Sequence, residues 1–195
     1  MIVVTQGKLQ TSVAAMAVGD TITARYTTTS MTAHGTFSEI GTANTAVLNQ
    51  FSSTNLDGYV YLLKIAKGVL VSCSQLYSGV TYNTFNAVNK VYGDKVTIGG
   101  RDYLIRLPKI SEYIAMCGDL NGMLDPIDRY DNFGVPNSGV GILEVIQENY
   151  NLGEGAWSFV TTPATVNNAS ANSTAKYARL VLEYADDPKC TDLYH

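Results

Sequence analysis

The chain has 195 residues, of which 46% are hydrophobic and only 15% are charged, whereas roughly 25% of the residues in an average soluble domain carry a charge. This length accommodates one domain or two small ones. The net charge is −4 and the 13 basic residues are scattered, which argues against a nucleic-acid partner. No apolar run reaches the roughly 18 residues of a membrane span, and the N-terminal residues lack a signal-peptide pattern, so we expect no membrane insertion.

Uncharged polar residues and 13 tyrosines must cover a surface that is poor in charge. Because tyrosine joins an apolar ring to a polar tip, it suits protein interfaces, and we expect a homo-oligomer. An ordinary β domain would have the same composition. Cys73, Cys117 and Cys190 are odd in number and lack the spacing of metal ligands. We therefore expect reduced thiols in a protein that folds in a cytoplasm, and no metal or other cofactor.

In the N-terminal part, alternation of apolar and polar residues predicts several strands. β-branched residues favour a strand at Thr21–Thr27, and Tyr59–Ala66 is apolar on both faces, which predicts a central strand. The other expected features, in chain order, are a helical turn at Thr11–Met16 capped by Thr11 or Ser12, a turn at Gly19–Asp20, a strand or turn pair at Gly35–Gly41, a tight turn at Asp57–Gly58, a turn at Lys67–Gly68 and a strand at Val69–Cys73 antiparallel to Tyr59–Ala66.

The period of the apolar residues changes near residue 81. Three apolar residues spaced three apart predict a short helix within Thr81–Val91, with Ser78 or Thr81 as its N-cap. Lys95–Leu107 is the clearest hairpin in the chain, because a Gly-Gly turn separates two alternating segments. Regular structure thins out between Lys109 and Gly155, apart from a helical turn expected near Glu112.

The C-terminal part holds the only tryptophan, Trp157. Ala156–Val160 and Tyr177–Tyr184 alternate as strands, and we expect them in one sheet. Between them, Pro163–Thr174 is uncharged and has no side chain large enough for a core, so we expect a polar loop on a β scaffold. Binding sites are often on such loops, and an inert surface loop is the alternative.

Several short motifs resemble, in their order, a module of bacteriophage tail and baseplate-associated proteins. They are Met16–Thr27 (MAVGDTITARYT), Gly35–Thr42 (GTFSEIGT), Leu56–Leu62 (LDGYVYL), Val80–Asn86 (VTYNTFN), the hairpin Ile98–Leu107, Leu120–Gly122 (LNG), Ala156–Phe159 (AWSF) and Ala178–Glu183 (ARLVLE). The resemblance covers the chain from Met16 onward, and it rests on the shared order of motifs that are individually short.

Proteins of this kind look like C-type-lectin-like domains displayed at the tips of phage tail fibres. The resemblance implies an α+β fold, mainly antiparallel β with few short helices and long loops, and C-type-lectin-like in the C-terminal half. It implies an N-terminal β module for virion attachment in residues 1–78 and a lectin-like β-rich module in residues 79–195, with one continuous domain as the alternative. Two departures are Tyr82, where a tryptophan is usual, and the loop 125–139, which lacks the family's tryptophan-containing run.

The resemblance implies a virion protein of the tail, fibre or baseplate, assembled in the host cytoplasm, that binds the host surface as an adhesin. Its expected partners are other virion proteins, further copies of itself (a trimer on a fibre) and a host surface glycan. A capsid or tail decoration protein that binds only virion proteins is one alternative, and a glycan-degrading tail enzyme is another. We expect no enzyme, because His34 and His195 have no nucleophile motif nearby.

Aromatic, acidic and amide side chains in the C-terminal half are the candidate ligand-binding residues. They are Tyr130, Asp131, Asn132, Trp157, Asn167, Asn168 and Asn172. Aromatic rings at such positions more often belong to a core or a subunit interface. Four aspartates crowd the segment from Asp119 to Asp131 without the spacing of an EF-hand, and turn-forming aspartates are the simpler interpretation. Arg179, among apolar neighbours, is expected to point to the surface or to pair with an acid.

Overall fold

The structure is a computed structural model that describes residues 7–29, 35–42, 57–73, 76–109, 111–112, 157–161, 164–168 and 176–185, with the backbone alone described at residues 78–79, 157–161, 164–168 and 176–177. In chain order, the elements are β1 (Leu9–Gln10), the 3₁₀ helix η1 (Val13–Ala15), β2 (Thr21–Thr27), β3 (Thr36–Ile40), β4 (Asp57–Ala66), β5 (Val69–Ser72), β6 (Tyr77–Val80), α1 (Tyr82–Asn86), β7 (Asp94–Ile98), β8 (Arg101–Arg106), β9 (Trp157–Thr161), β10 (Ala164–Asn168), β11 (Lys176–Ala178) and β12 (Val181–Glu183). The protein is therefore mainly β with few short helices, as expected.

The largest sheet has eight strands in the order β1-β2-β4-β5-β12-β8-β7, with β3 as an additional partner of β2. β1 pairs in parallel with the start of β2, where Leu9 lies opposite Thr21. β3 pairs antiparallel with the rest of β2, where Ala24 lies opposite Ile40. β4 pairs with every residue of β2, from Thr21 to Thr27. β1 and β3 therefore share the other edge of β2.

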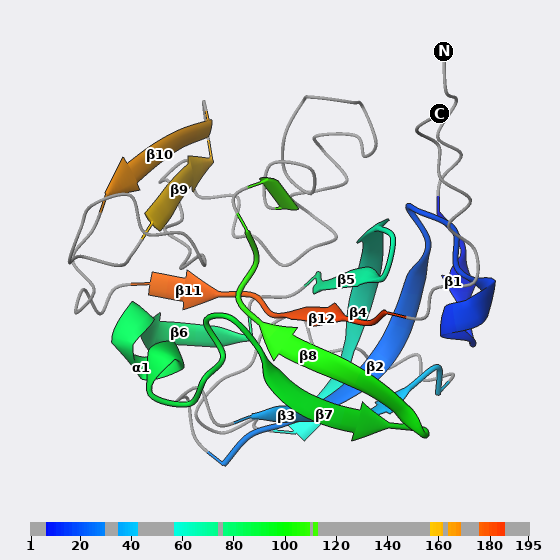
Figure 1. The fold of residues 1–195 in the computed structure, drawn as a ribbon. Coiled ribbons are helices and arrows are strands. Elements are labelled where there is room, and N and C mark those ends of the chain that lie inside the picture. Colours follow the sequence, from blue (N-terminus) through cyan, green and yellow to red (C-terminus); the bar gives the residue numbers. More distant parts are fainter. Residues whose placement is uncertain are drawn as a thin grey trace.

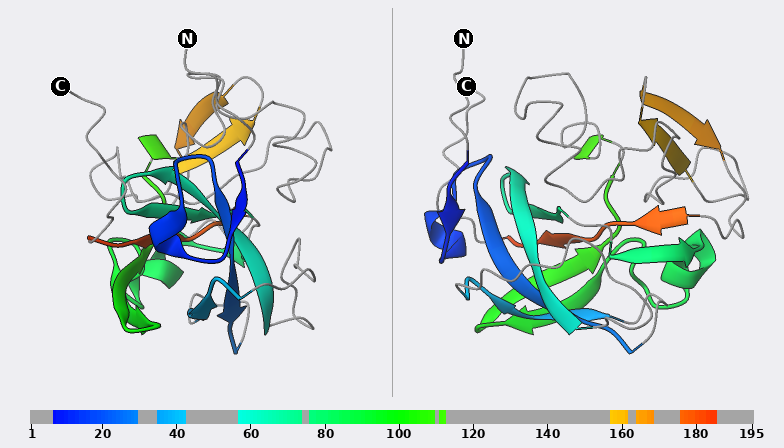
Figure 2. Two further views of the ribbon diagram at one scale, coloured as in Figure 1. Left: turned by 90° about the vertical axis from the view of Figure 1, so that its right-hand side faces the viewer. Right: turned by 180° about the vertical axis from the view of Figure 1, so that it is seen from behind.

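The sheet curls into an open barrel, in which β3 and β7 contact each other across a seam (Figures 1 and 2). No ladder joins β3 to β7 among the described strands. The barrel combines strands from both sides of residue 78, because β12 lies between β5 and β8. No helix in the described ranges is long and apolar enough to span a membrane.

Alternating residues of each strand fill the barrel. In β2, Ile22, Ala24 and Tyr26 are fully buried, whereas Arg25 and Thr27 on the other face are more exposed. The buried cluster consists of Val13, Met16, Ile22, Ala24, Tyr26, Phe37, Val60, Leu62, Leu70, Leu76, Tyr77, Val80, Tyr82, Phe85, Val91, Ile98, Tyr103, Ile105, Leu107, Ala178, Leu180, Leu182 and Tyr184. This single cluster draws on every strand of the barrel except the short β1, so it fixes the register of the sheet.

An aromatic stack closes the end of the barrel next to α1. The ring centroids of Tyr26 and Phe37 are 4.8 Å apart, those of Tyr26 and Tyr77 are 5.9 Å apart, and those of Tyr77 and Phe85 are 5.3 Å apart. The hydroxyl of Tyr77 also accepts a hydrogen bond from the Gly35 amide at 3.2 Å. The two contacts of Tyr77 are edge-on, a favoured geometry for aromatic rings, whereas the rings of Tyr26 and Phe37 are tilted by 59°. Together these contacts attach α1 to the barrel.

Helix α1 begins as the sequence predicts and ends earlier. The Thr81 hydroxyl accepts a hydrogen bond from the Thr84 amide at 3.1 Å, which confirms Thr81 as the N-cap. The helix stops at Asn86, and Asn89 has a positive φ of 59°. Asparagine tolerates this left-handed conformation and is a poor helix former, which explains why the helical pattern does not extend to Val91.

The strand β4 is central, and its two faces are both covered, as its apolar sequence predicts. Leu62 is fully buried in the barrel, and Leu63, which points to the opposite face, is also buried. The neighbouring Val71 and Val181 on that opposite face are buried as well. The expected turn at Lys67–Gly68 and the antiparallel strand β5 are confirmed.

One sequence-based expectation about local structure is wrong, and another is correct only in part. Asp57–Gly58 is not a tight turn but the start of β4, paired with Thr27 and Tyr26. The Asp57 carboxylate accepts hydrogen bonds from Arg25 and Thr27 on β2, and these cross-strand contacts extend the ladder. The helical turn expected at Thr11–Met16 is present as the 3₁₀ turn η1, with Ser12 at its N-cap position, but the Ser12 side chain makes no capping hydrogen bond.

The C-terminal strands do not lie in one sheet. β9 pairs with β10, β11 pairs with β6, and β12 joins the barrel. The expected polar loop Pro163–Thr174 is therefore partly a strand, because Ala164–Asn168 pairs with β9 over five residues. β-branched residues at Thr165 and Val166 favour this extended pairing. Figures 1 and 2 show the β9–β10 hairpin on the side of the molecule near β11.

Arg179 is buried, so its expected position at the surface is wrong. It is 1% exposed, and its guanidinium donates hydrogen bonds to the carbonyl oxygens of Ser72 and Cys73. The Leu180 amide donates to the Ser72 hydroxyl at 3.1 Å. The carbonyl groups at the end of β5 thus provide the acceptors that a buried guanidinium requires.

Candidate functional site

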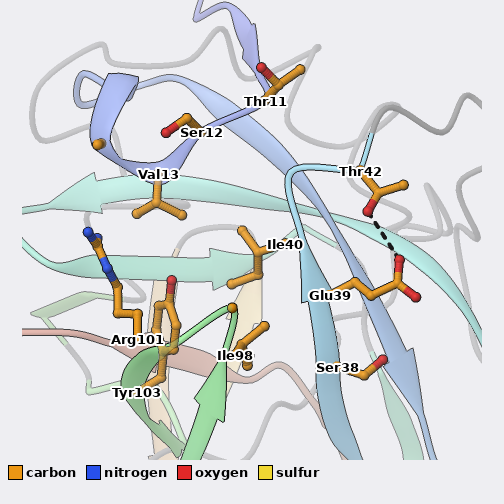
Figure 3. Close-up of a pocket in the computed structure, with 12 residues that line it drawn as sticks. Thr11, Ser12, Val13, Ser38, Glu39, Ile40, Thr42, Ile98, Arg101 and Tyr103 are labelled. Carbon is orange, nitrogen blue, oxygen red and sulfur yellow. Dashed lines mark hydrogen bonds between the residues drawn. The ribbon is translucent and has the colours of Figure 1, made fainter.

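A cleft of about 440 Å³ lies at the open end of the barrel (Figure 3). Three elements enclose it: η1 with the residues before it, the end of β3, and the β7–β8 hairpin. The described residues that line it are Thr11, Ser12, Val13, Ala14, Ser38, Glu39, Ile40, Thr42, Ile98, Gly99, Arg101 and Tyr103. Its volume is in the range of small-molecule sites in proteins.

The η1 wall is held by a buried carboxylate. Asp20 accepts hydrogen bonds from the Lys8 amide at 2.8 Å, from Gln10 Nε2 at 2.9 Å and from the Ala17 amide at 2.9 Å. Burial raises the pKa of Asp20, but the hydrogen bonds from Ala17, Lys8 and Gln10 together outweigh it, so the net pKa is lowered. Lys64 Nζ donates to the Met16 carbonyl at 2.9 Å and attaches the same wall to β4.

The β3 wall contains a β-bulge. Arg25 lies opposite Glu39 and Tyr26 opposite Phe37, so Ser38 has no partner in the β2–β3 ladder. Ile40, after the bulge, points into the cleft (Figure 3). Gly41 follows with a positive φ of 87°, and a Cβ there would overlap the Thr11 carbonyl, so only glycine allows this close approach of the two walls.

The third wall is the β7–β8 hairpin, which confirms the hairpin expected at Lys95–Leu107. Gly99 and Gly100 have φ of 59° and 80°, the signs that a type I′ turn requires. Ile98 and Tyr103 point into the cleft from the two strands (Figure 3). The guanidinium carbon of Arg101 lies 5.3 Å from the centroid of the Tyr184 ring, a cation–π distance.

Glu39 belongs to a charged network on the outer face of β2, β3 and β4. Hydrogen bonds from Tyr59 and Thr42, and a weaker one from Arg25 at 3.4 Å, lower the pKa of Glu39. Arg25 also binds Asp57 with two hydrogen bonds at 3.0 and 2.6 Å, and this contact lowers the pKa of Asp57 to about 2. Both carboxylates are therefore anionic at neutral pH, and Glu39 places a fixed negative charge at the rim of the cleft.

The cleft combines an apolar centre with charged and hydroxyl groups at its rim. Figure 3 shows Val13, Ile40 and Ile98 pointing toward its centre, with Arg101 and Glu39 on opposite sides. Most of the other lining residues carry a hydroxyl group, and the exceptions are Ala14 and Gly99. Within the described ranges, no group of three His, Cys, Asp or Glu side chains is arranged to hold a metal ion.

The structure brings three of the candidate residues from the sequence together and does not describe the others. Asn168 lies opposite Trp157, and Asn167 lies opposite Ser158, in the β9–β10 hairpin. Four further candidates lie outside the described residues: Tyr130, Asp131, Asn132 and Asn172. The aspartates from Asp119 to Asp128, the two histidines, Cys117 and Cys190 also lie outside them.

Sequence reasoning did not identify the cleft. Arg101 and Tyr103 were assigned to a hairpin, and Ser38 to a strand, without a functional role. The Gly-Gly turn followed by an arginine was a visible signal. The sequence pattern did not show that η1 and β3 lie opposite this turn, because those contacts join residues far apart in the chain. Comparisons of the chain with protein-family models, curated proteins and solved structures found no match.

Proposed function

We propose that this chain is a structural protein of a bacteriophage virion, in the tail, fibre or baseplate, and that it binds the host cell surface as an adhesin. The proposal starts from the ordered motifs that resemble phage tail and baseplate-associated proteins. The observation that carries it is the position of these motifs in the fold. Six of them coincide with β2, β3, β4, α1, the β7–β8 hairpin and β12.

These motifs are not scattered over the molecule. Five of the six elements are strands of one barrel, and α1 is attached to it by the contact between Phe85 and Tyr77. Two of the motifs, Gly35–Thr42 and Ile98–Leu107, supply two walls of the cleft. A shared order of motifs that also forms one structural unit is the expected result of common ancestry, and it supports the phage assignment.

The binding role has two proposed contact regions on this scaffold. One is the cleft at the barrel mouth, and the other is the β9–β10 hairpin, which brings Trp157, Asn167 and Asn168 together. We assign the hairpin to a C-type-lectin-like region in the C-terminal half of the chain, the same half that contributes β8 and β12 to the barrel. The chain acts as a trimer on a fibre, bound to other virion proteins, and it catalyses no reaction.

The experiment uses phage particles from the strain that encodes the chain. Immunogold electron microscopy with an antibody against the purified protein should label the tail end of the particles. The purified protein should also bind the host cells and reduce phage adsorption in a competition assay.

Each outcome decides between the proposal and its alternatives. Label over the capsid or along the tail tube, without competition for adsorption, would favour a decoration protein. Release of reducing sugar from host envelopes would favour a tail enzyme. Absence of the chain from purified particles would contradict the virion assignment itself. A stable monomer in light scattering would contradict the trimer.

A further inference from the structure

We infer that the cleft at the barrel mouth binds an acidic saccharide, whose carboxylate or phosphate contacts Arg101 and whose ring packs on the apolar centre of the cleft. This inference rests on the proposed function, because it names the ligand class of the same site.

Arg101 is held in place by an aromatic ring. Its guanidinium carbon lies 5.3 Å from the centroid of the Tyr184 ring, and its side chain lines both the cleft and a second hollow beside Gly100 and Ala185. Stacking uses the face of a guanidinium, whereas its hydrogen bonds form in its plane, so the two contacts are compatible. Guanidinium groups recognise carboxylates and phosphates through paired, charge-assisted hydrogen bonds.

The rest of the cleft matches the two kinds of surface on a sugar ring. Ile40, which is partly buried, points into the cleft, and the edges of Ile98 and Tyr103, which are 5% and 4% exposed, form its floor (Figure 3). This small apolar surface suits the C–H face of a single sugar ring. Ser12 and Ser38 are on the rim, and their hydroxyl groups can both donate and accept hydrogen bonds, as sugar hydroxyls require. A volume of about 440 Å³ suits one or two sugar units rather than a long extended peptide.

Charge sets the orientation of the ligand. Figure 3 shows Arg101 and Glu39 on opposite sides of the cleft. The Glu39 carboxylate is anionic and already accepts hydrogen bonds from Tyr59 and Thr42. An anionic substituent near Glu39 would be repelled, whereas the same group near Arg101 is attracted. The acid of the saccharide therefore lies at the hairpin side, and its neutral hydroxyls lie toward β3.

The test is an NMR titration of the full-length protein with three matched probes. Glucuronic acid carries a carboxylate, glucose 6-phosphate carries a phosphate, and glucose carries neither. At probe concentrations up to about 20 mM, a range suited to weak single-sugar binding, the acids should shift the amide signals of Ser12, Gly99 and Arg101 saturably. At least one acid should bind about tenfold more tightly than glucose, and the comparison of the two acids identifies the preferred anion.

Variants on one hairpin provide the control. Arg101→Gln should weaken binding of the acid about tenfold. Arg101→Lys keeps the charge but loses the planar guanidinium, so its affinity for the acid should lie between those of the wild type and Arg101→Gln. Lys95→Gln removes the same charge from an exposed side chain that pairs with Asp102 at 2.7 Å, and it should leave binding unchanged. Thermal melts of each variant show whether it is folded.

Several results would overturn the inference. One is equal binding of glucose and the two acids to the wild-type protein, or no binding of any of them. Another is unchanged binding of the acid by a folded Arg101→Gln variant. Tighter binding of a blocked acidic tripeptide than of both sugar acids would replace the saccharide by a peptide. If the antibody labels phage tails but the protein binds neither acid, this inference alone is contradicted. If the protein binds an acid but is absent from phage particles, only the proposed function is contradicted.

Discussion

Replacing Asp20 tests how the η1 wall of the cleft is held. The carboxylate accepts three hydrogen bonds at 2.8 to 2.9 Å in a residue that is only 7% exposed. Hydrogen bonds to charged groups contribute roughly 1.5 to 3 kcal/mol each, and they are not additive when they share one acceptor. We expect Asp20→Ala to lower the free energy of unfolding by about 2 to 4 kcal/mol, because the Lys8 and Ala17 amides lose the acceptor of their part-buried hydrogen bonds.

The isosteric change Asp20→Asn separates charge from shape. Its amide oxygen can replace Oδ2, which accepts from Ala17 and Gln10, but its NH₂ group then faces the Lys8 amide. The hydrogen bond from the Lys8 amide is lost, and this amide then faces another donor. We therefore expect the free energy of unfolding to fall by about 1 to 2 kcal/mol. Asp102→Ala is the matched control, because Asp102 is 55% exposed at its side chain, and it should cost no more than about 0.5 kcal/mol.

The pH dependence follows from the direction of the Asp20 pKa. The folded-state pKa lies below the ordinary value of 3.8, so folding favours the ionised form. This contribution to stability is fully present above the unfolded pKa and is lost as the pH falls through the folded pKa. The difference in stability between wild type and Asp20→Ala should therefore be constant from pH 7 to about pH 5 and should shrink below about pH 4.

Urea unfolding followed by circular dichroism at a series of pH values measures each quantity. A difference that stays constant down to about pH 2.5 would refute the charged-acceptor explanation. A loss of unfolding free energy below about 0.5 kcal/mol for Asp20→Ala at pH 7 would show that the hydrogen bonds to Asp20 do not hold the η1 wall.

Three further predictions test the core and the charges of the barrel. Arg106→Met should lower the free energy of unfolding in urea by about 3 to 5 kcal/mol, because the Arg106 side chain is 2% exposed and binds two glutamates. A loss below about 1 kcal/mol would argue against this network. Leu182→Ala should cost about 2 to 5 kcal/mol, because Leu182 is fully buried between β5 and β8, and a thermal melt like that of wild type would contradict its place in the core. In a Cys117→Ser/Cys190→Ser variant, Cys73 should react with a thiol reagent only as fast as the protein unfolds, because burial raises the pKa of its thiol to about 12. Rapid labelling of Cys73 in the native state would count against this burial.

The sequence by itself determined most of the local structure. β-branched alternation predicted β2 at Thr21–Thr27, and the apolar faces of Tyr59–Ala66 predicted a central strand. The Gly-Gly turn predicted the β7–β8 hairpin, and Thr81, the cap of α1, was one of the two residues predicted for that position. These features depend on residues within a few positions of one another, so their signals lie in short windows of the chain. The polar segment after Pro163 was misread because composition alone does not show a strand partner.

The tertiary structure decided which strands meet and which polar groups are buried. β12 pairs with β5 and β8, although its sequence fits pairing with any apolar edge, and the register is selected by burial of one shared core. Arg179 is buried because distant carbonyl groups at the end of β5 accept its hydrogen bonds, and Arg106 is buried between the distant Glu183 and the nearby Glu112. The cleft exists only because the curled sheet brings Arg101 opposite the bulge at Ser38 and the η1 wall. Contacts between residues far apart in the chain depend on the packing of the whole core, and no local pattern encodes them.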